Sequence, residues 1–134
     1  MKVALFGTCN SSQWRNDLIP LLQIEYFNPV VEDWTPECQE REIQERASAD
    51  FILYALTPRM IGLFSIAELI DDSNKQPQKT LFIILKDKDD DGFAIDFIRP
   101  VKKSLDAIAK LAVSNGARHF NSLEDVASYL NNQG

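Results

Sequence analysis

Short apolar runs alternate along this chain with longer stretches that have helical periodicity. The apolar runs cover residues 2–6, 24–27, 51–56, 81–85 and 118–120, and most of them end at turn-forming residues, as expected for buried strands. The runs at 51–56 and 81–85 are apolar on both faces. This is typical of central strands in a parallel sheet that helices cover on both sides.

The segments between these runs carry signals for helices. Asn10-Ser11-Ser12 offers an N-cap for a first helix whose end is marked by Pro20, and Thr35-Pro36 opens a highly charged helix that runs to about Ala49. Three further helices are expected at 63–70 (closed by 71–74), within 98–115, and from Ser122 onward, where Glu124 and Asp125 follow a capping residue.

Five alternations of strand and helix, without tandem hairpins or repeats, predict an α/β fold in one domain spanning residues 1–134. We expect a flavodoxin-like, doubly wound sheet of five parallel strands in a three-layer α/β/α arrangement, with strand order 2-1-3-4-5. Ligands bind such folds beyond the carboxyl ends of the strands, where the strand order reverses. The segments 7–12, 28–34 and 57–68 should line that crevice.

The charge balance argues against an anionic polymer or surface as the partner. The chain has 14 basic and 20 acidic residues, a net charge of −6 and a pI near 4.7, so we expect neither nucleic-acid nor membrane binding. Lys102, Lys103 and Lys110 stand at helical spacing, as on a solvated helix face. The chain begins without a signal-peptide pattern, and no apolar stretch reaches the length of a membrane span.

Cysteine and histidine usage predicts a cytoplasmic protein without a metal centre. Cys9 and Cys38 are far apart and lack CxxC spacing, which favours two reduced thiols, and a single histidine argues against a zinc site. Asp87, Asp89, Asp91 and Gly92 match half of a calcium loop. However, Ile98 takes the place of the closing glutamate and a strand precedes the loop, so a charged turn is expected instead.

Glu68 is the first candidate for chemistry. It lies one to two turns into the helix that follows the central strand, and Ser65 stands one turn earlier on the same face. A carboxylate in the crevice can stabilise the cationic transition state of a sugar C–N or C–O bond, or trap it covalently. The alternative is a glutamate on the polar side of a surface helix. The apolar residues 66–67 and 69–70 around it favour partial burial.

Three segments of the chain resemble the nucleoside 2-deoxyribosyltransferase family. They are Gly7-Thr8-Cys9-Asn10 with Trp14-Arg15, the stretch Asn28-Pro29-Val30-Val31-Glu32-Asp33-Trp34, and Thr57-Pro58 with Gly62 and Ser65-Ile66-Ala67-Glu68. The middle segment is the most specific, and the resemblance covers about residues 2–85. The family has a flavodoxin-like fold, which agrees with the pattern of strands and helices.

The resemblance implies roles for two carboxylates. Glu68 takes the position of the family's nucleophile, which attacks the anomeric carbon and expels the base. Glu42 takes the position of an acidic residue that contacts or protonates the departing base; its alternative is a solvated charge on its helix. The family carries a further aspartate where this chain has Gly62, which leaves the substrate open.

The candidate substrate-binding residues belong to the same segments. Trp34 either stacks on a planar base or is a buried structural tryptophan, whereas Trp14 is expected in the core. Arg15 is a candidate for holding a carboxylate or phosphate, and the main-chain amides from Thr8 to Ser12 for binding an anion. The full set of predicted substrate-binding residues is Gly7, Thr8, Arg15, Asn28, Asp33, Trp34, Gly62 and Ser65.

These features lead to one functional hypothesis and two alternatives. The first is an enzyme of the N-glycosidic bond that acts on a small nucleoside or nucleotide without a cofactor or metal. A hydrolase would open the same glycosyl-enzyme with water, and a binding module would keep the fold without the chemistry, consistent with Gly62. Because a neighbouring subunit completes the active site in this family, the resemblance also implies a homo-oligomer, a dimer or larger.

Overall fold

A five-stranded parallel sheet forms the centre of the protein. The computed structural model describes residues 1–133 except 10–11, 59, 61 and 87–94, and for residues 95–97 it describes only the backbone. The strands are β1 (Lys2–Gly7), β2 (Glu25–Phe27), β3 (Phe51–Leu56), β4 (Thr80–Ile84) and β5 (Arg118–Phe120). Their order is β2-β1-β3-β4-β5, which confirms the predicted topology and fold class.

The two wholly apolar runs are adjacent in the sheet, as predicted. β3 pairs in parallel with β4, in a register that places Ile52 opposite Thr80 and Leu56 opposite Ile84. β3 also pairs with β1 on its other side, so it is the central strand. All six of its residues are buried, and each large apolar side chain there contributes about 1.5–3 kcal/mol by leaving water.

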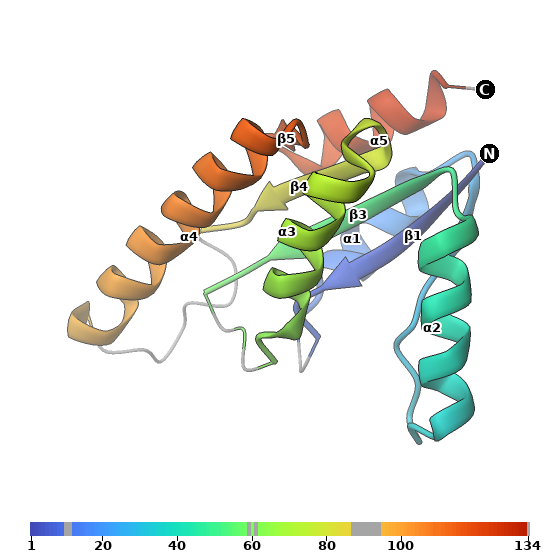
Figure 1. Cartoon of the computed structure of the whole chain (residues 1–134), viewed down its shortest axis with the longest axis horizontal. Coiled ribbons are helices and arrows are strands. Elements are labelled where there is room, and N and C mark those ends of the chain that lie inside the picture. The colour runs from blue at the N-terminus through green and yellow to red at the C-terminus, as the bar shows by residue number, and fades with distance from the viewer. Residues whose placement is uncertain (10–11, 59, 61, 87–94, 134) are drawn as a thin grey trace.

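Helices cover both faces of the sheet and complete the three layers (Figure 1). The helices α3 (Phe64–Lys75) and α4 (Ile95–Asn115) lie on one face, and α1 (Trp14–Leu18) and α5 (Leu123–Asn131) lie on the other. A 3-10 turn, η1 (Ile19–Leu21), extends α1, and another, η2 (Pro77–Lys79), precedes β4. The remaining helix, α2 (Pro36–Ser48), has no fully buried residue, and its first half projects beyond the sheet.

The helix that carries Glu68 is longer than the sequence pattern indicates. The polar residues 71–74 were expected to end it, but α3 continues to Lys75. Asp72 and Ser73 are 2% and 0% exposed. Asp72 accepts hydrogen bonds from Arg46, and Ser73 accepts one from the side chain of Asn115. The prediction of a helix end was wrong because these polar side chains have partners in neighbouring elements instead of in solvent.

Capping of the helices follows the sequence only in part. Ser122 caps α5, since its hydroxyl accepts a hydrogen bond from the Asp125 amide. Thr35 occupies the N-cap of α2, but its side chain makes no capping hydrogen bond. The first helix has Gln13 at its N-cap position, without a side-chain bond, instead of a residue at 10–12. The expectation for residues 10–11 lies outside the described part of the chain.

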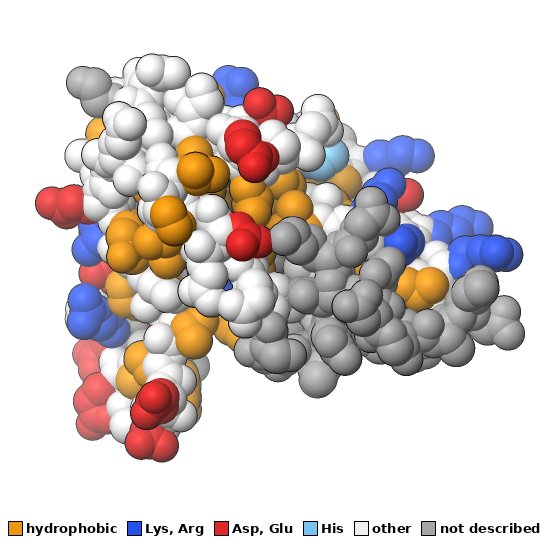
Figure 2. Space-filling view, turned by 180° about the vertical axis from the view of Figure 1, so that it is seen from behind, with side chains coloured by type: hydrophobic (Ala, Val, Ile, Leu, Met, Phe, Trp, Pro, Cys, Tyr) orange, Lys and Arg blue, Asp and Glu red, His pale blue; other side chains and the backbone are white. Residues whose placement is uncertain are grey.

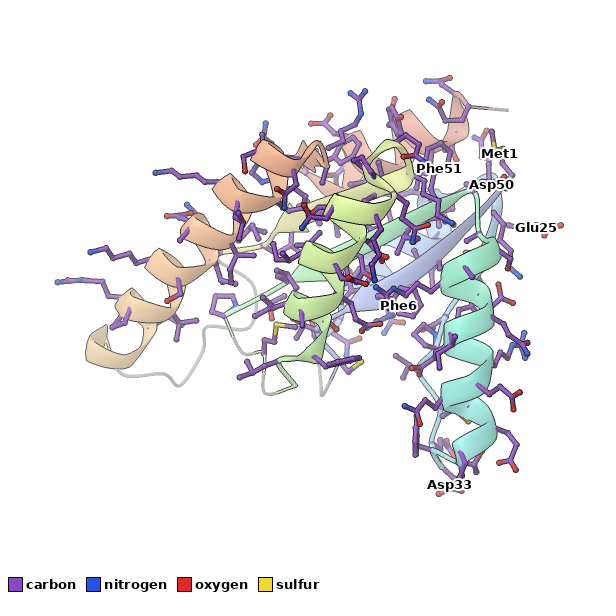
Figure 3. The ribbon with its side chains drawn as sticks, viewed as in Figure 1. Met1, Phe6, Glu25, Asp33, Asp50 and Phe51 are labelled. Carbon is purple, nitrogen blue, oxygen red and sulfur yellow. The ribbon has the colours of Figure 1, made fainter. Side chains whose placement is uncertain are left out.

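One edge of the sheet is fixed by polar contacts at the amino ends of β1 and β3. The Lys2 amide donates to Asp50 at 2.8 Å, and the Lys2 ammonium group lies 2.8 Å from Glu45. Figure 3 shows Met1, Glu25, Asp50 and Phe51 at this edge and Phe6 at the opposite end of β1. The carboxyl edge near Phe6, close to α3, is therefore the place to look for a site.

The structure bears on the predictions of reduced cysteines and of a chain without a membrane span. Cys9 and Cys38 are unpaired thiols. Among the helices of the described residues, none has the length and apolar character needed to cross a membrane. The turn from Asp87 to Gly92 that resembles half of a calcium loop lies outside the described residues.

Candidate active site

A cavity of about 220 Å³ opens at the carboxyl end of β1, beside β3. This is the position at which the strand order reverses, the usual ligand site of such sheets. The end of β1, one residue of α2, the loop after β3 and the first turns of α3 contribute to its wall. The lining residues are Gly7, Cys9, Glu42, Met60, Gly62, Phe64, Ser65 and Glu68. Five of the ten predicted site residues are therefore brought together around one space.

Glu68 is not a freely solvated surface glutamate. Its side chain is 18% exposed, and its carboxylate lies 3.5 Å from the guanidinium group of Arg46. Burial raises the pKa of Glu68 above its usual value, and nearby Asp72, Glu42 and Asp71 raise it further, whereas Arg46 opposes the shift. Glu68 is therefore a carboxyl group whose ionisation depends on its surroundings.

Glu42 is the second carboxyl group at the cavity. It is partly buried on α2, and this burial raises its pKa, while the charge of Arg15 acts in the opposite direction. The charge of Glu42 is also one of those that raise the pKa of Glu68. Because an ion pair supports the ionised form of Glu68, Glu68 is the better carboxylate and Glu42 the better acid.

Arg46 connects the second helix to the third. Its Nε donates to Asp72 Oδ2 at 2.8 Å and its Nη2 to Asp72 Oδ1 at 2.9 Å, a bidentate arrangement. Nη2 also lies 3.0 Å from Asp71. The hydroxyl group of Tyr54 donates to Asp72 from below, in the central strand. Arg46 and this tyrosine were not among the predicted site residues.

Thr8, directly after β1, and Arg15, in α1, do not line the cavity. They are 2% and 5% exposed. The Thr8 carbonyl accepts hydrogen bonds of 2.8 Å from Trp14 Nε1 and Arg15 Nη1, and Arg15 Nη2 donates to the Leu5 carbonyl. The guanidinium group therefore binds main-chain carbonyls in the structure, while Trp14 is fully buried, as expected of a core residue.

The residues that follow β2 also lie away from the cavity wall. Asn28 accepts a hydrogen bond from the Val30 amide, which shapes the turn. Trp34 is 58% exposed, so the alternative of a buried structural tryptophan is wrong. Asp33 is exposed and lies at the outer end of α2, far from the sheet (Figure 3). In this arrangement neither side chain reaches the space beside Glu68.

Sequence reasoning missed three lining residues, Cys9, Met60 and Phe64. All three belong to segments that were predicted to line the crevice, but nothing in their residue types indicated a role. Arg46 had a usable signal, since it stands four residues after Glu42 and therefore shares its helix face. The spacing alone did not show that this face is turned toward Glu68.

Two other hollows, of about 390 and 500 Å³, lie beside β4, β5 and α4. They share Lys86, Asp106 and His119. Among the described residues that line them, the one carboxylate is Asp106, which is already 2.6 Å from the Lys86 ammonium group. In that part of the chain they lack the pair of carboxyl groups found at the smaller cavity. Within the residues that the structure describes, no group of three or more His, Cys, Asp or Glu side chains is placed to hold a metal ion.

Comparison with known proteins gives no match, either to a protein-family model or to a curated protein. Support for a function therefore comes from the cavity with its two glutamates and from the resemblance found in residues 2–85.

Proposed function

We propose that the protein cleaves, or transfers at, the N-glycosidic bond of a nucleoside or nucleotide, with Glu68 as nucleophile. The observation that carries the proposal is the convergence of Glu68 and Glu42 on one cavity at the switch point of the sheet. Both have a pKa raised by burial, a common property of catalytic acids and nucleophiles. The segments that resemble the nucleoside 2-deoxyribosyltransferases contain or surround these residues.

The first step would form a bond between Glu68 and the sugar. A carboxylate oxygen of Glu68 attacks the anomeric carbon, and the electron pair of the C–N bond leaves with the base. The transition state carries positive charge on the sugar, which the ionised Glu68 stabilises. The partner Arg46 keeps Glu68 ionised at the distance of an ion pair, so that the carboxylate retains negative charge despite its burial.

Glu42 would supply the proton that the departing base needs. Its raised pKa keeps part of the population protonated closer to neutral pH, which suits a general acid. It stands on α2, across the cavity from the α3 residues Ser65 and Glu68. The base would therefore lie toward α2 and the sugar toward α3.

The size of the cavity limits what is enclosed. Pockets for drug-sized ligands usually measure about 300–1,000 Å³, whereas this one measures about 220 Å³. We propose that it holds the sugar, with the base at the mouth beside Phe64, which is 73% exposed. The glycosyl-enzyme would then be opened either by a second base, which is transfer, or by water, which is hydrolysis.

A binding module without chemistry is the second candidate function. The observation that favours it is Gly62, which stands where the family carries an aspartate. A side chain at this position would meet no atom within 4 Å of its Cβ. The space for the missing carboxylate is therefore present although the carboxylate is not. The open cavity and the half-buried Glu68 favour the enzyme.

We propose that the protein acts in the cytoplasm on a small nucleoside or nucleotide, consistent with its two unpaired thiols, and that it works as a homo-oligomer. Support for the oligomer comes from apolar residues at the mouth of the cavity, where Leu63 and Phe64 are 65% and 73% exposed. Exposed large side chains at a functional edge are typical of interaction sites. A second copy seated there would close the mouth and exclude water from the reaction.

Light scattering tests the oligomer. We expect a dimer or larger at micromolar concentration and a shift toward monomer in Phe64→Ser, because the substitution removes the exposed aromatic side chain at the mouth. Leu111→Ser is the matched control, since Leu111 is 50% exposed on α4 and should leave the mass unchanged. A monomeric wild-type protein would contradict the oligomer.

The pH dependence of Glu42→Gln tests the proton donor. Wild-type activity should fall as the pH rises through the raised pKa of Glu42, because the acid loses its proton there. The variant should be about 10²-fold slower where Glu42 is protonated, and should lose this alkaline decline. The pH–rate profile of base release measures both effects. An unchanged profile would remove Glu42 from the mechanism.

A further inference from the structure

We infer that Arg46 is a positioning residue that fixes the carboxylate of Glu68 in the cavity, and that Asp72 and Tyr54 hold Arg46 in place. The inference rests on the proposed role of Glu68, which it deepens. It assigns a task to a buried cluster that neither the sequence pattern nor the resemblance included. Arg46 itself does not line the cavity, so its effect on the reaction would pass through Glu68.

The guanidinium group has a fixed orientation. Two parallel hydrogen bonds of 2.8 and 2.9 Å join its Nε and Nη2 to the two oxygens of Asp72. Because the guanidinium group is planar, these bonds also determine where the third nitrogen, Nη1, lies. Nη1 is the atom that faces Glu68 at 3.5 Å. The position of the Glu68 carboxylate thus depends on that of Asp72.

Asp72 is itself anchored in the protein interior. It is 2% exposed, and its carboxylate accepts further hydrogen bonds from the Tyr54 hydroxyl and from Gln76 Nε2. Tyr54 is fully buried in the central strand. A chain of contacts therefore leads from the buried central strand of the sheet through Asp72 and Arg46 to Glu68.

The helical spacing explains how one arginine reaches all these groups. Glu68, Asp71 and Asp72 stand at positions i, i+3 and i+4 of α3, so they share one face. Arg46 comes from the last turns of α2, one helical turn after Glu42. The same side chain therefore joins the two helices that carry the proposed nucleophile and the proposed acid.

The acidic groups around Glu68 favour its protonated form, and Arg46 opposes them. The groups that face it are Glu42 from α2, Asp71 and Asp72 from α3, and Tyr54 from β3, together with Arg46. Arg46 is the one cation among these described neighbours. Without it, burial and the adjacent acids would keep the Glu68 carboxyl protonated to higher pH, and a protonated carboxyl cannot attack the sugar.

The test is a direct titration of Glu68 by carbon NMR of glutamate labelled at the side-chain carboxyl, assigned by the signal missing in Glu68→Gln. In Arg46→Gln we expect the midpoint to rise by about one pH unit or more, whereas Arg46→Lys should keep most of the wild-type midpoint. Arg41→Gln is the matched control, because Arg41 lies on the same helix, is 68% exposed, and contacts Glu45 and the Phe27 ring instead of Glu68. Equal midpoints in Arg46→Gln and Arg41→Gln would overturn the inference.

A second measurement does not require a variant at Arg46 to fold. The Nη1 nitrogen signal of Arg46 in the wild-type protein should shift with the midpoint of Glu68, and the shift should be absent in Glu68→Gln. A signal that does not follow Glu68 would contradict the contact. Both titrations are made without substrate, so failure of the proposed function would appear separately, as absence of base release from a protein whose Glu68 titrates as expected.

Discussion

Glu68→Gln should abolish base release and leave the protein folded. The amide keeps the size of the side chain but can neither attack the anomeric carbon nor stabilise positive charge on the sugar. Since nucleophilic and electrostatic contributions are each worth several kcal/mol, we expect a loss of about 10³-fold or more in rate. Release of free base from the substrate, followed by chromatography, measures this loss.

The same variant should not lower the melting temperature at neutral pH. The pKa of Glu68 is raised in the folded protein, so the stability linked to this group is present below its unfolded-state pKa and is lost as the pH rises through the folded-state pKa. Above the folded-state pKa the ionised group therefore opposes folding, and removing its charge relieves that cost. A variant that loses activity and unfolds would show a structural role instead, and one that keeps its activity would exclude Glu68 as nucleophile.

Gly7→Ala should destabilise the protein by about 3 kcal/mol or more. Gly7 ends β1 with a φ of +124°, a backbone angle that residues with a side chain rarely adopt. An added Cβ would lie 2.0 Å from the Ala55 carbonyl oxygen. That oxygen belongs to the central strand and accepts a hydrogen bond from the Thr8 amide. Neither Gly7 nor Ala55 can therefore move away without breaking the contact between β1 and β3. Urea denaturation at equilibrium measures the change in the free energy of unfolding.

Gly62→Ala is the matched control, because Gly62 lines the same cavity. A Cβ at this position would meet nothing within 4 Å, so we expect a change in stability below about 0.5 kcal/mol, as for ordinary surface substitutions. Similar losses in both variants would show that the two glycines do not differ in the way the structure describes. Activity of Gly62→Ala also reports whether the cavity tolerates added volume on that side.

The fold could be predicted because its strands carry little ambiguity. The runs at 51–56 and 81–85 are apolar on both faces, which restricts them to the covered centre of a parallel sheet. The length of α3 could not be predicted in the same way. Asp72 and Ser73 resemble a helix end, and only the tertiary contacts with Arg46 and Asn115 explain why they lie inside the helix.

The part of the site that could be predicted is the part where the order of the strands alone brings segments together. Gly7, Gly62 and Ser65 follow neighbouring strands, so their segments must meet at the carboxyl edge. Asp33 also follows a strand, but the long connection before α2 carries it outward to the projecting end of the helix. Sequence spacing gives no information on the direction of such a connection.

The distribution of surface charge was predicted only in sign. The net charge is −6, yet the space-filling view shows Lys and Arg side chains gathered at its right-hand side, and acidic and basic side chains mixed at its left-hand side (Figure 2). α4 carries Lys102, Lys103 and Lys110, whereas α2 carries acidic residues together with Arg41 and Arg46. The net charge of the chain averages over these two regions, so it does not describe the charge near the cavity or near α4.

The measurement that tests the central claim most directly is incubation of the wild-type protein with a panel of ribonucleosides, 2′-deoxyribonucleosides and their 5′-phosphates, with and without a second free base. We predict that free base, or a nucleoside with the exchanged base, forms from at least one compound, and that Glu68→Gln forms neither. Binding of a nucleoside without release or exchange of base from any compound would contradict the enzyme and establish the binding module in its place.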